Sequence, residues 1–223
     1  GIVWDDAMIL SASRTPLTAS GVREIFTTPV DRLYRPLRTL GFSIEHSLGA
    51  SAREFHITNI ILYALVCYLF FHFALQLSGS LPIAASSSAL FAAHPLHAEV
   101  VSSISNGRAD LLCAVFIFSS LYFFLLTPRN PANALLSLLL FALAALSKES
   151  AIVFSALIFI IALSRPLEEK RPDIAKAFLP ALVSTLPFLA VSLIYIFIRH
   201  KFIGGVSQAT LYHGGSLKNT MLT

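Results

Sequence analysis

Charged residues are scarce in this sequence of 223 residues. Asp, Glu, Lys and Arg together make up 13 % of the chain, about half the share found in ordinary soluble domains, and hydrophobic residues make up 56 %. A soluble fold of this composition could not cover its apolar core with polar surface. The same values exclude intrinsic disorder and a collagen-like repeat. The sequence therefore predicts an integral membrane protein, in agreement with a mean hydropathy of +0.74.

Cysteine and net charge are also low. The two cysteines, Cys67 and Cys113, lie inside apolar runs, which is typical of buried thiols and excludes a disulfide-rich secreted scaffold. Sixteen Lys and Arg against twelve Asp and Glu give a net charge of +4. This excess is too small and too scattered to predict nucleic-acid binding. The chain has no internal repeat and no Asn-x-Ser/Thr glycosylation site.

Six uncharged segments follow one another after residue 56. They cover residues 57–77, 81–93, 111–126, 132–146, 151–163 and 177–198. The first and last, with 21 and 22 residues, can cross a hydrocarbon layer of ~30 Å as helices. The middle four reach that length only if polar residues at their ends extend each helix. We therefore predict an all-α polytopic membrane protein with about six spans, in which ionisable groups lie below the membrane surface and mark a functional site.

The distribution of charge divides the chain into three regions. Residues 1–54 carry six arginines and six of the twelve acids, and we predict that they form an external loop with an acidic motif. Residues 55–203 form the predicted transmembrane bundle, and residues 204–223 begin a further external loop. The chain starts at Gly1 without an initiator methionine, so we interpret it as part of a longer protein with another span before residue 1.

Counting crossings places the polar motifs on one side of the membrane. If each segment crosses once, residues 1–54, 94–110, 147–150 and the chain from 199 onward emerge together. Residues 78–80, 127–131 and 164–176 emerge on the other side and carry most of the Lys and Arg of the short loops. That bias predicts that this second side is cytoplasmic. The first side holds the polar motifs, which predicts one recessed polar cavity at that face.

An acidic pair, Asp5 and Asp6, stands near the start of the chain. Adjacent carboxylates point in different directions, so one could serve as a general base while the other binds a metal or holds the loop. The alternative is a solvated helix cap.

Two histidines and an acid, His94, His97 and Glu99, fall within six residues. On a helix, the three-residue spacing would put both imidazoles on one face, where they could bind a metal or donate hydrogen bonds to a phosphate. The four-residue spacing of the zinc-protease motif is absent. The alternative is a pair of interfacial histidines that cap a helix beside Pro95.

Arg108 and Lys148 are predicted to lie at membrane depth, where a cation needs a counter-charge or an anionic ligand. One interpretation pairs each cation with the nearest acid, Asp110 or Glu149. The other assigns both cations to a lipid phosphate, which accepts the forked donors of arginine and the point charge of lysine. Arg35 adds a cation on the same side, and by itself belongs to a surface turn.

Taken in order, these motifs carry a resemblance. They are the Asp-Asp pair at 5–6, YRPL at 34–37, FAAHPLHAE at 91–99, GRADLL at 107–112 and LSKES at 146–150. The series resembles the membrane region of the transmembrane and tetratricopeptide-repeat O-mannosyltransferase family, a branch of the GT-C glycosyltransferases. The match runs from about residue 4 to residue 163. Residues 100–106 depart from the family pattern because they are rich in serine and lack a tryptophan before Gly107.

The resemblance implies a GT-C type protein O-glycosyltransferase. Such an enzyme transfers a sugar, typically mannose, from a polyprenyl or dolichyl phosphate to a Ser or Thr hydroxyl of a protein. We assign Asp5 as the base, with Asp6 or Glu99 as its orienting partner, and transfer in one displacement inverts the anomeric centre. The predicted ligands of the donor phosphate are Arg35, His94, His97, Arg108 and Lys148, and the predicted orienting residues are Asp110 and Glu149.

The resemblance also bears on the cofactor, on the missing repeats and on the cellular compartment. No cofactor is required by the residues, and a divalent metal is left open, with Asp6, His94, His97 and Glu99 as its candidate ligands. Tetratricopeptide repeats would lie beyond residue 223. A bacterial inner membrane with a periplasmic active site is favoured over the endoplasmic reticulum with a lumenal one.

Two other classes of protein compete with the enzyme. A secondary transporter would use intramembrane ionisable groups as a solute path, but the polar motifs cluster at one face and no repeated halves are present. A catalytically silent membrane scaffold would retain the fold without the chemistry. The sequence does not identify the sugar, the acceptor or the oligomeric state.

Overall fold

The computed structural model describes residues 6–30, 33–128, 130–164 and 174–203, and within these ranges the chain is helical. No strand occurs there beyond one isolated bridge between Val30 and Leu33. The elements are α1 (Asp6–Ala12), α2 (Ala19–Thr27), α3 (Pro36–Ser47), α4 (Ala52–Ser78), α5 (Leu81–Ala93), α6 (Leu96–Ser102), α7 (Ser105–Leu126), α8 (Ala132–Ser147), the 3-10 turn η1 (Glu149–Val153), α9 (Phe154–Ser164) and α10 (Ile174–Ile203). The predicted class, an all-α polytopic membrane protein, is confirmed.

Three helices are long and apolar enough to cross a membrane: Ala52–Ser78, Ser105–Leu126 and Ala177–Ile203. The other apolar segments form the shorter helices Leu81–Ala93, Ala132–Ser147 and Glu149–Ser164. Each of the six predicted segments is therefore helical, and half of them reach full span length. The third segment does so because polar residues extend it: α7 begins at Ser105 and includes Arg108 and Asp110 in its first turns.

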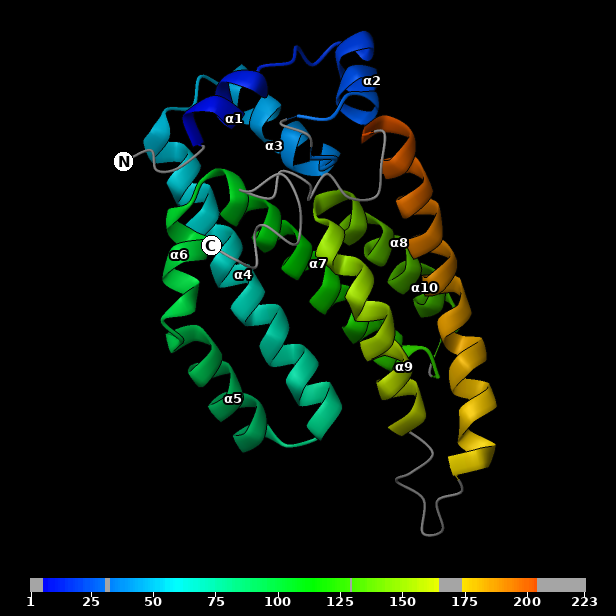
Figure 1. The fold of residues 1–223 in the computed structure, drawn as a ribbon. Helices are drawn as coiled ribbons and strands as arrows, with labels where there is room; N and C mark the ends of the chain where they lie inside the picture. The colour runs from blue at the N-terminus through cyan, green and yellow to red at the C-terminus, as the bar shows by residue number, and fades with distance from the viewer. Residues whose placement is uncertain (1–5, 31–32, 129, 165–173, 204–223) are drawn as a thin grey trace, which may run out of the picture.

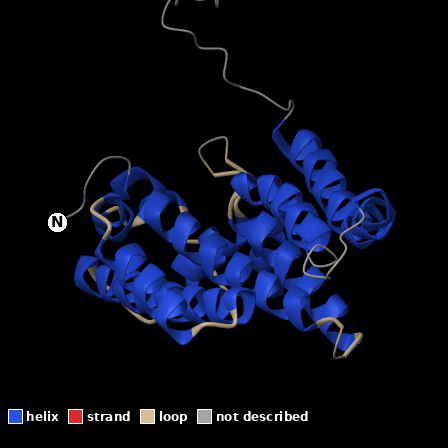
Figure 2. Cartoon of the chain, turned by 90° about the horizontal axis from the view of Figure 1, so that it is seen from below, coloured by secondary structure: helices blue, strands red, loops and turns tan. Residues whose placement is uncertain are grey.

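The apolar helices alternate in direction, so one end of the bundle collects the polar connections (Figure 1). α4 descends from the upper end, α5 and α6 return together, α7 descends, α8 returns, α9 descends and α10 returns. The short helices α1, α2 and α3 cover the upper end as a cap, which here means residues 6–30 and 33–47. Seen from the lower end, the helices pack side by side with short loops between them (Figure 2). Within the described residues the helices alternate in direction as predicted, and the side of the membrane that each end faces stays a prediction.

Local sequence signals explain where the second crossing bends. Pro95 disfavours the helical conformation in the residue before it, and His94 is extended, with φ −70° and ψ 126°. α5 ends there, and α6 starts afresh at Leu96. The return from the lower end is thus made by two helices with a break at His94. The long α4 has clearer limits: Ser51 and Glu54 form a capping box at its start, and Gly79 takes a left-handed φ of 64° at its end.

The apolar core of the bundle lies between α7, α8, α9 and α10. Phe141 and Ile158 are fully buried, and the Phe188 ring packs edge-on against Phe141 at 5.4 Å. Two buried serines join α7 to α8, because the hydroxyl of Ser120 donates to the Ser137 carbonyl and the Ser137 hydroxyl donates to the Ser120 carbonyl, both at 2.8 Å. This exchange satisfies polar groups that would otherwise be costly to bury.

Gly107 allows α6 to approach α7 closely. A Cβ atom at this position would lie 1.8 Å from the carbonyl oxygen of Val100, which belongs to the α6 backbone. Since backbone cannot rotate away as a side chain can, any larger residue would push α6 off α7. The glycine before Arg108 therefore has a packing role.

We predict that Gly107→Ala lowers the stability of the protein by about 1–3 kcal/mol, because the added methyl overpacks the α6–α7 contact. The loss would be measured as a lower melting temperature in detergent. Gly41→Ala in α3 is the matched control, since the nearest atom to its new Cβ is Arg108 Nη1 at 3.9 Å. Equal melting temperatures for the two variants would contradict the packing role.

Candidate functional site

Three ion pairs lie at the upper end of the bundle, and each joins segments far apart in the sequence. Arg108 pairs with Glu45, Arg35 with Glu149, and Lys148 with Asp110. The pairs expected within single motifs, Arg108 with Asp110 and Lys148 with Glu149, are therefore wrong. The cations instead connect the cap, the start of α7 and the η1 turn.

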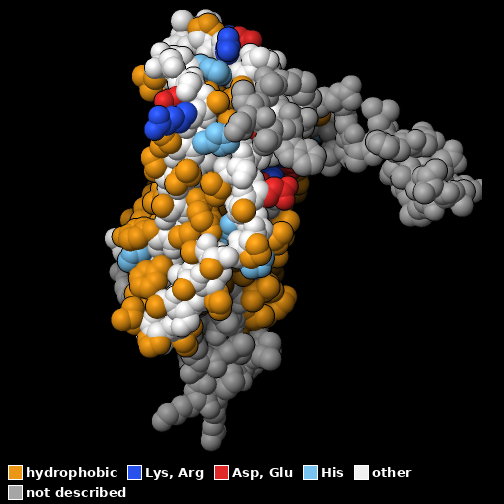
Figure 3. Space-filling view, turned by 90° about the vertical axis from the view of Figure 1, so that its left-hand side faces the viewer, with side chains coloured by type: hydrophobic (Ala, Val, Ile, Leu, Met, Phe, Trp, Pro, Cys, Tyr) orange, Lys and Arg blue, Asp and Glu red, His pale blue; other side chains and the backbone are white. Residues whose placement is uncertain are grey.

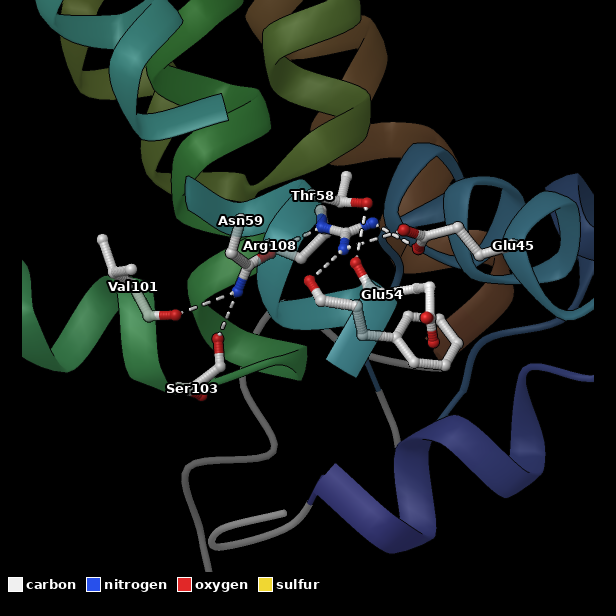
Figure 4. A network of polar contacts seen from close by, with 8 residues as sticks. Glu45, Glu54, Thr58, Asn59, Val101, Ser103 and Arg108 are labelled. Carbon is white, nitrogen blue, oxygen red and sulfur yellow. Dashed lines mark hydrogen bonds and ion pairs between the residues drawn. The ribbon is translucent and has the colours of Figure 1, made fainter. Parts of the chain in front are cut away.

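Arg108 is the most enclosed of these cations, with its side chain 3 % exposed. Its Nε donates to Asn59 Oδ1 at 2.7 Å, Nη1 to Glu45 Oε2 at 2.6 Å, and Nη2 to the Phe55 carbonyl at 3.1 Å (Figure 4). The guanidinium also lies 5.1 Å from the centre of the Phe42 ring. All three guanidinium nitrogens thus donate hydrogen bonds within the protein, so this geometry favours a structural role that fixes α3 and α4 against α7. The donor-phosphate role stays a prediction.

Asn59 is the second buried polar group in this network. Its amide nitrogen donates to the carbonyl oxygens of Ser103 and Val101, at 2.8 and 3.4 Å, while its Oδ1 accepts from Arg108. It stands in the apolar α4, and the lone asparagine at membrane depth was an available signal that the motif analysis did not use. Glu45 gave no comparable signal, because it looks like one more charge on a short polar helix.

Arg35 makes a forked contact with Glu149. Its Nε donates to Oε2 at 3.0 Å and its Nη2 to Oε1 at 2.7 Å, while Nη1 donates to Asn106 Oδ1 at 3.3 Å. The arginine is 7 % exposed and the carboxylate 29 %. This pair binds the start of α3 to the turn between α8 and α9. Asn106 was also missed by the motif analysis.

The ion pair of Lys148 and Asp110 is more open, with side chains 21 % and 38 % exposed. The Lys148 ammonium contacts a single oxygen, Asp110 Oδ1. Asp110 lies one turn after Asn106 on α7, so the two ion pairs are neighbours on one helix face.

A cavity of about 290 Å³ opens beside Asp110. It lies between α4, α5, α6, α7 and the η1–α9 segment, and its polar groups are Tyr63, His97, Asp110 and Ser150. The remaining wall is apolar and includes Leu111, Ile117 and Phe154. One carboxylate, Asp110, therefore lines a space whose walls are mostly hydrocarbon, and its ion pair brings Lys148 close to that space. Figure 3 shows the face made by α4, α5 and α6: its lower part is covered by hydrophobic side chains, and the acids, lysines and arginines visible there lie toward the upper end.

Asp6 is fully buried and holds the start of α7. Its Oδ2 accepts from the backbone N–H of Ile104 at 3.2 Å and its Oδ1 from that of Ser105 at 2.8 Å. A carboxylate at a helix N-terminus is favoured by the exposed N–H groups and the helix dipole. Asp6 thus binds α7 about one helical turn before Arg108. Asp5, the predicted base, lies outside the described residues.

His94 and His97 do not share a helix face, since the break at His94 separates them. Their rings still lie 5.7 Å apart, and His97 packs against Phe91 at 4.4 Å. Glu99 is exposed on α6. Among the described residues, no three His, Cys, Asp or Glu side chains gather in a way that could hold a metal ion.

The fold and the site together define a class: a polytopic α-helical membrane protein with a charged site at one end of the bundle, beside an apolar cavity. Comparison with curated proteins then finds relatives named protein O-mannosyl-transferases. Mouse TMTC2 is 38 % identical over 89 residues, which is 40 % of this chain and 10 % of the relative. F38B6.6 of Caenorhabditis elegans is 33 % identical over 135 residues, 59 % of this chain and 19 % of the relative. Human TMTC3 is 30 % identical over 170 residues, 68 % of this chain and 18 % of the relative.

These relatives confirm the resemblance to the transmembrane and tetratricopeptide-repeat O-mannosyltransferase family that the ordered motifs indicated. The chain spans between a tenth and a fifth of the length of these curated relatives. No family model matches the sequence, and no solved structure matches it.

We predict that Arg108→Ala destabilises the protein by about 3–5 kcal/mol, because the partly buried Glu45 would lose its counter-charge, and Asn59 and the Phe55 carbonyl would lose a buried donor. The expected readout is a lower melting temperature and a smaller folded fraction in detergent. Arg53→Ala removes an exposed arginine from the start of α4 and is the matched control. A normally stable Arg108→Ala protein with weakened donor binding would instead support the phosphate role.

Proposed function

We propose that this chain is the membrane part of a protein O-mannosyltransferase. It would transfer mannose from a polyprenyl or dolichyl phosphate to a Ser or Thr hydroxyl of an acceptor protein on the extracytoplasmic side. The names of the relatives and the order of the motifs support the reaction. The observation that carries the proposal is the apolar cavity with the ion pair of Lys148 and Asp110 at its rim. The compartment, bacterial or endoplasmic, stays a prediction.

The cavity suits the two chemically different parts of such a donor. An isoprenoid tail is favoured against walls such as Leu111, Ile117 and Phe154, and a phosphate is favoured beside Lys148. His97 stands at the same cavity and can donate a hydrogen bond to an anion without itself needing a positive charge. A donor bound here would present its sugar toward the cap.

The transfer requires one base. The acceptor hydroxyl attacks the anomeric carbon, the bond from that carbon to the phosphate oxygen breaks, and the phosphate leaves with the electron pair. The proton of the hydroxyl passes to a carboxylate, which we assign to Asp5. Nearby cations stabilise the negative charge that develops on the leaving phosphate. The next residue, Asp6, supports this assignment, because its carboxylate accepts two hydrogen bonds from the start of α7.

We predict that Asp5→Asn lowers mannosyl transfer by about 10²–10⁴-fold, the usual contribution of a general base. The assay follows mannose from a polyprenyl phosphate donor to a Ser/Thr peptide, with membrane insertion checked in parallel. Glu24→Gln, which neutralises an exposed acid of α2, should transfer at the wild-type rate. Unchanged turnover in Asp5→Asn would remove Asp5 from the mechanism. If Asp5→Asn instead lost solute flux while its glycosylation stayed intact, the result would favour a transporter.

We further predict that Ala114→Phe raises the KM for the lipid-linked donor about tenfold, because the ring would fill the cavity that Ala114 lines. The KM would be measured with saturating peptide acceptor. Ala85→Phe places the same ring on the exposed surface of α5 and should leave the KM unchanged. Similar KM values for both variants would place the donor elsewhere.

A further inference from the structure

The last turns of α10 bring a third cation to the two neighbouring ion pairs. Tyr195 donates a hydrogen bond from its hydroxyl to the Tyr34 carbonyl at 3.1 Å, and the Phe202 ring stacks on the Tyr34 ring at 5.4 Å. Arg199 lies between these two residues on the same helix face, four residues after the first and three before the second. It therefore faces the Tyr34–Arg35 segment, and its charge acts on the Glu149 carboxylate.

Arg199 has no carboxylate of its own among the described residues. Both oxygens of Glu149 are already used by Arg35, and Asp110 binds Lys148. The Nε atom of Arg199 is buried and makes no hydrogen bond within the described part of the chain. Residues 204–223, which follow α10, contain no Asp or Glu.

Among the described residues around η1, the positive charges therefore outnumber the carboxylates. Arg35 binds Glu149 and Lys148 binds Asp110, which leaves Arg199 without a carboxylate partner in this part of the chain. A partly buried charge at the end of membrane helices is costly unless an anion accompanies it. A sugar linked to a polyprenyl phosphate is a phosphodiester with one negative charge, which matches the excess. After transfer, the phosphate monoester carries more negative charge, so the same cation would also stabilise the leaving group.

We infer that Arg199 binds the phosphate of a lipid-linked ligand at this site. The identification of that ligand as the sugar donor rests on the proposed function. The inference adds a residue that lies outside the matched motifs, at the end of the last described helix. It also gives the buried Nε a partner that the described chain does not supply.

The test uses the full-length protein in phosphatidylcholine nanodiscs and a photoactivatable polyprenyl phosphate as the probe. Arg199→Gln should weaken probe binding about tenfold, the loss expected for one charged hydrogen-bonding contact. Lys201→Gln removes an exposed cation two residues further along the same helix and should bind as the wild type does. Equal binding by Arg199→Gln and Lys201→Gln would overturn the inference.

Competition distinguishes the sources of the phosphate. Unlabelled polyprenyl phosphate should displace the probe more effectively than phosphatidylglycerol or inorganic phosphate. Equal displacement by either of these two competitors would overturn the inference, because Arg199 would then contact ordinary headgroups or free phosphate. If Arg199→Gln does not fold, Arg199→Met keeps the length of the side chain and removes its charge. Wild-type affinity in that folded variant would overturn the inference, because a phosphate contact depends on the charge.

Mannosyl transfer by the wild type separates this inference from the proposed function. Probe binding that depends on Arg199, without any transfer to a Ser/Thr peptide, would overturn the proposed function and retain the phosphate site. Normal transfer by the wild type, with no loss of probe binding in Arg199→Gln, would overturn the phosphate site at Arg199 and retain the proposed function.

Discussion

The pairing of buried cations is the constraint on which the upper end of the molecule depends. An arginine keeps its charge in proteins, so at membrane depth it must meet an acid or another anion. Arg108 of α7 reaches up to Glu45 in the cap, and Arg35 of the cap reaches down to Glu149 of η1. Because the two contacts run in opposite directions between cap and bundle, together they fix where the cap sits.

The first two turns of α7 organise this end of the bundle. The N–H of Ser105 binds Asp6, the side chain of Asn106 accepts from Arg35, and Asp110 holds Lys148. Between them, Arg108 binds α3 and α4. Successive residues on a helix point in different directions, so one short segment can hold four separate parts of the chain. The close approach of α6 at Gly107 completes the arrangement.

The sequence predicted the elements of this fold better than their contacts. Apolar runs located the helices, and counting crossings placed Asp6, His97, Arg108 and Lys148 at one end. The ion partners could not be found in the same way, because they lie 63 residues apart for Arg108 and Glu45 and 114 for Arg35 and Glu149. Pairing each cation with the nearest acid failed because near neighbours in the chain point in different directions. Arg108 and Asp110, two positions apart on α7, do not face each other, and Lys148 is extended, with φ −156° and ψ 139°, between α8 and Glu149 of η1.

The helix break beside the histidines was not predicted, and the reason is different. Pro95 was a signal in the sequence for an extended residue at position 94, and the spacing of His94 and His97 was interpreted as continuous helix instead. Asn59 was likewise visible as a polar residue near the start of an apolar run. Both features are local, whereas the role of Glu45 depends on how distant helices pack.

The exposed fractions of the cations separate those that hold the fold from those that can exchange a partner. Arg108 is 3 % exposed, and releasing it would break several short contacts and leave the partly buried Glu45 without a counter-charge. Lys148 is 21 % exposed and contacts one oxygen of a carboxylate that is itself 38 % exposed. A lysine ammonium is a point charge on a flexible stem, so it can turn from Asp110 to a phosphate without a demand on geometry. In the proposed reaction Asp110 would then neutralise the charge of Lys148 between turnovers. The site would therefore carry less unpaired charge when no donor is bound.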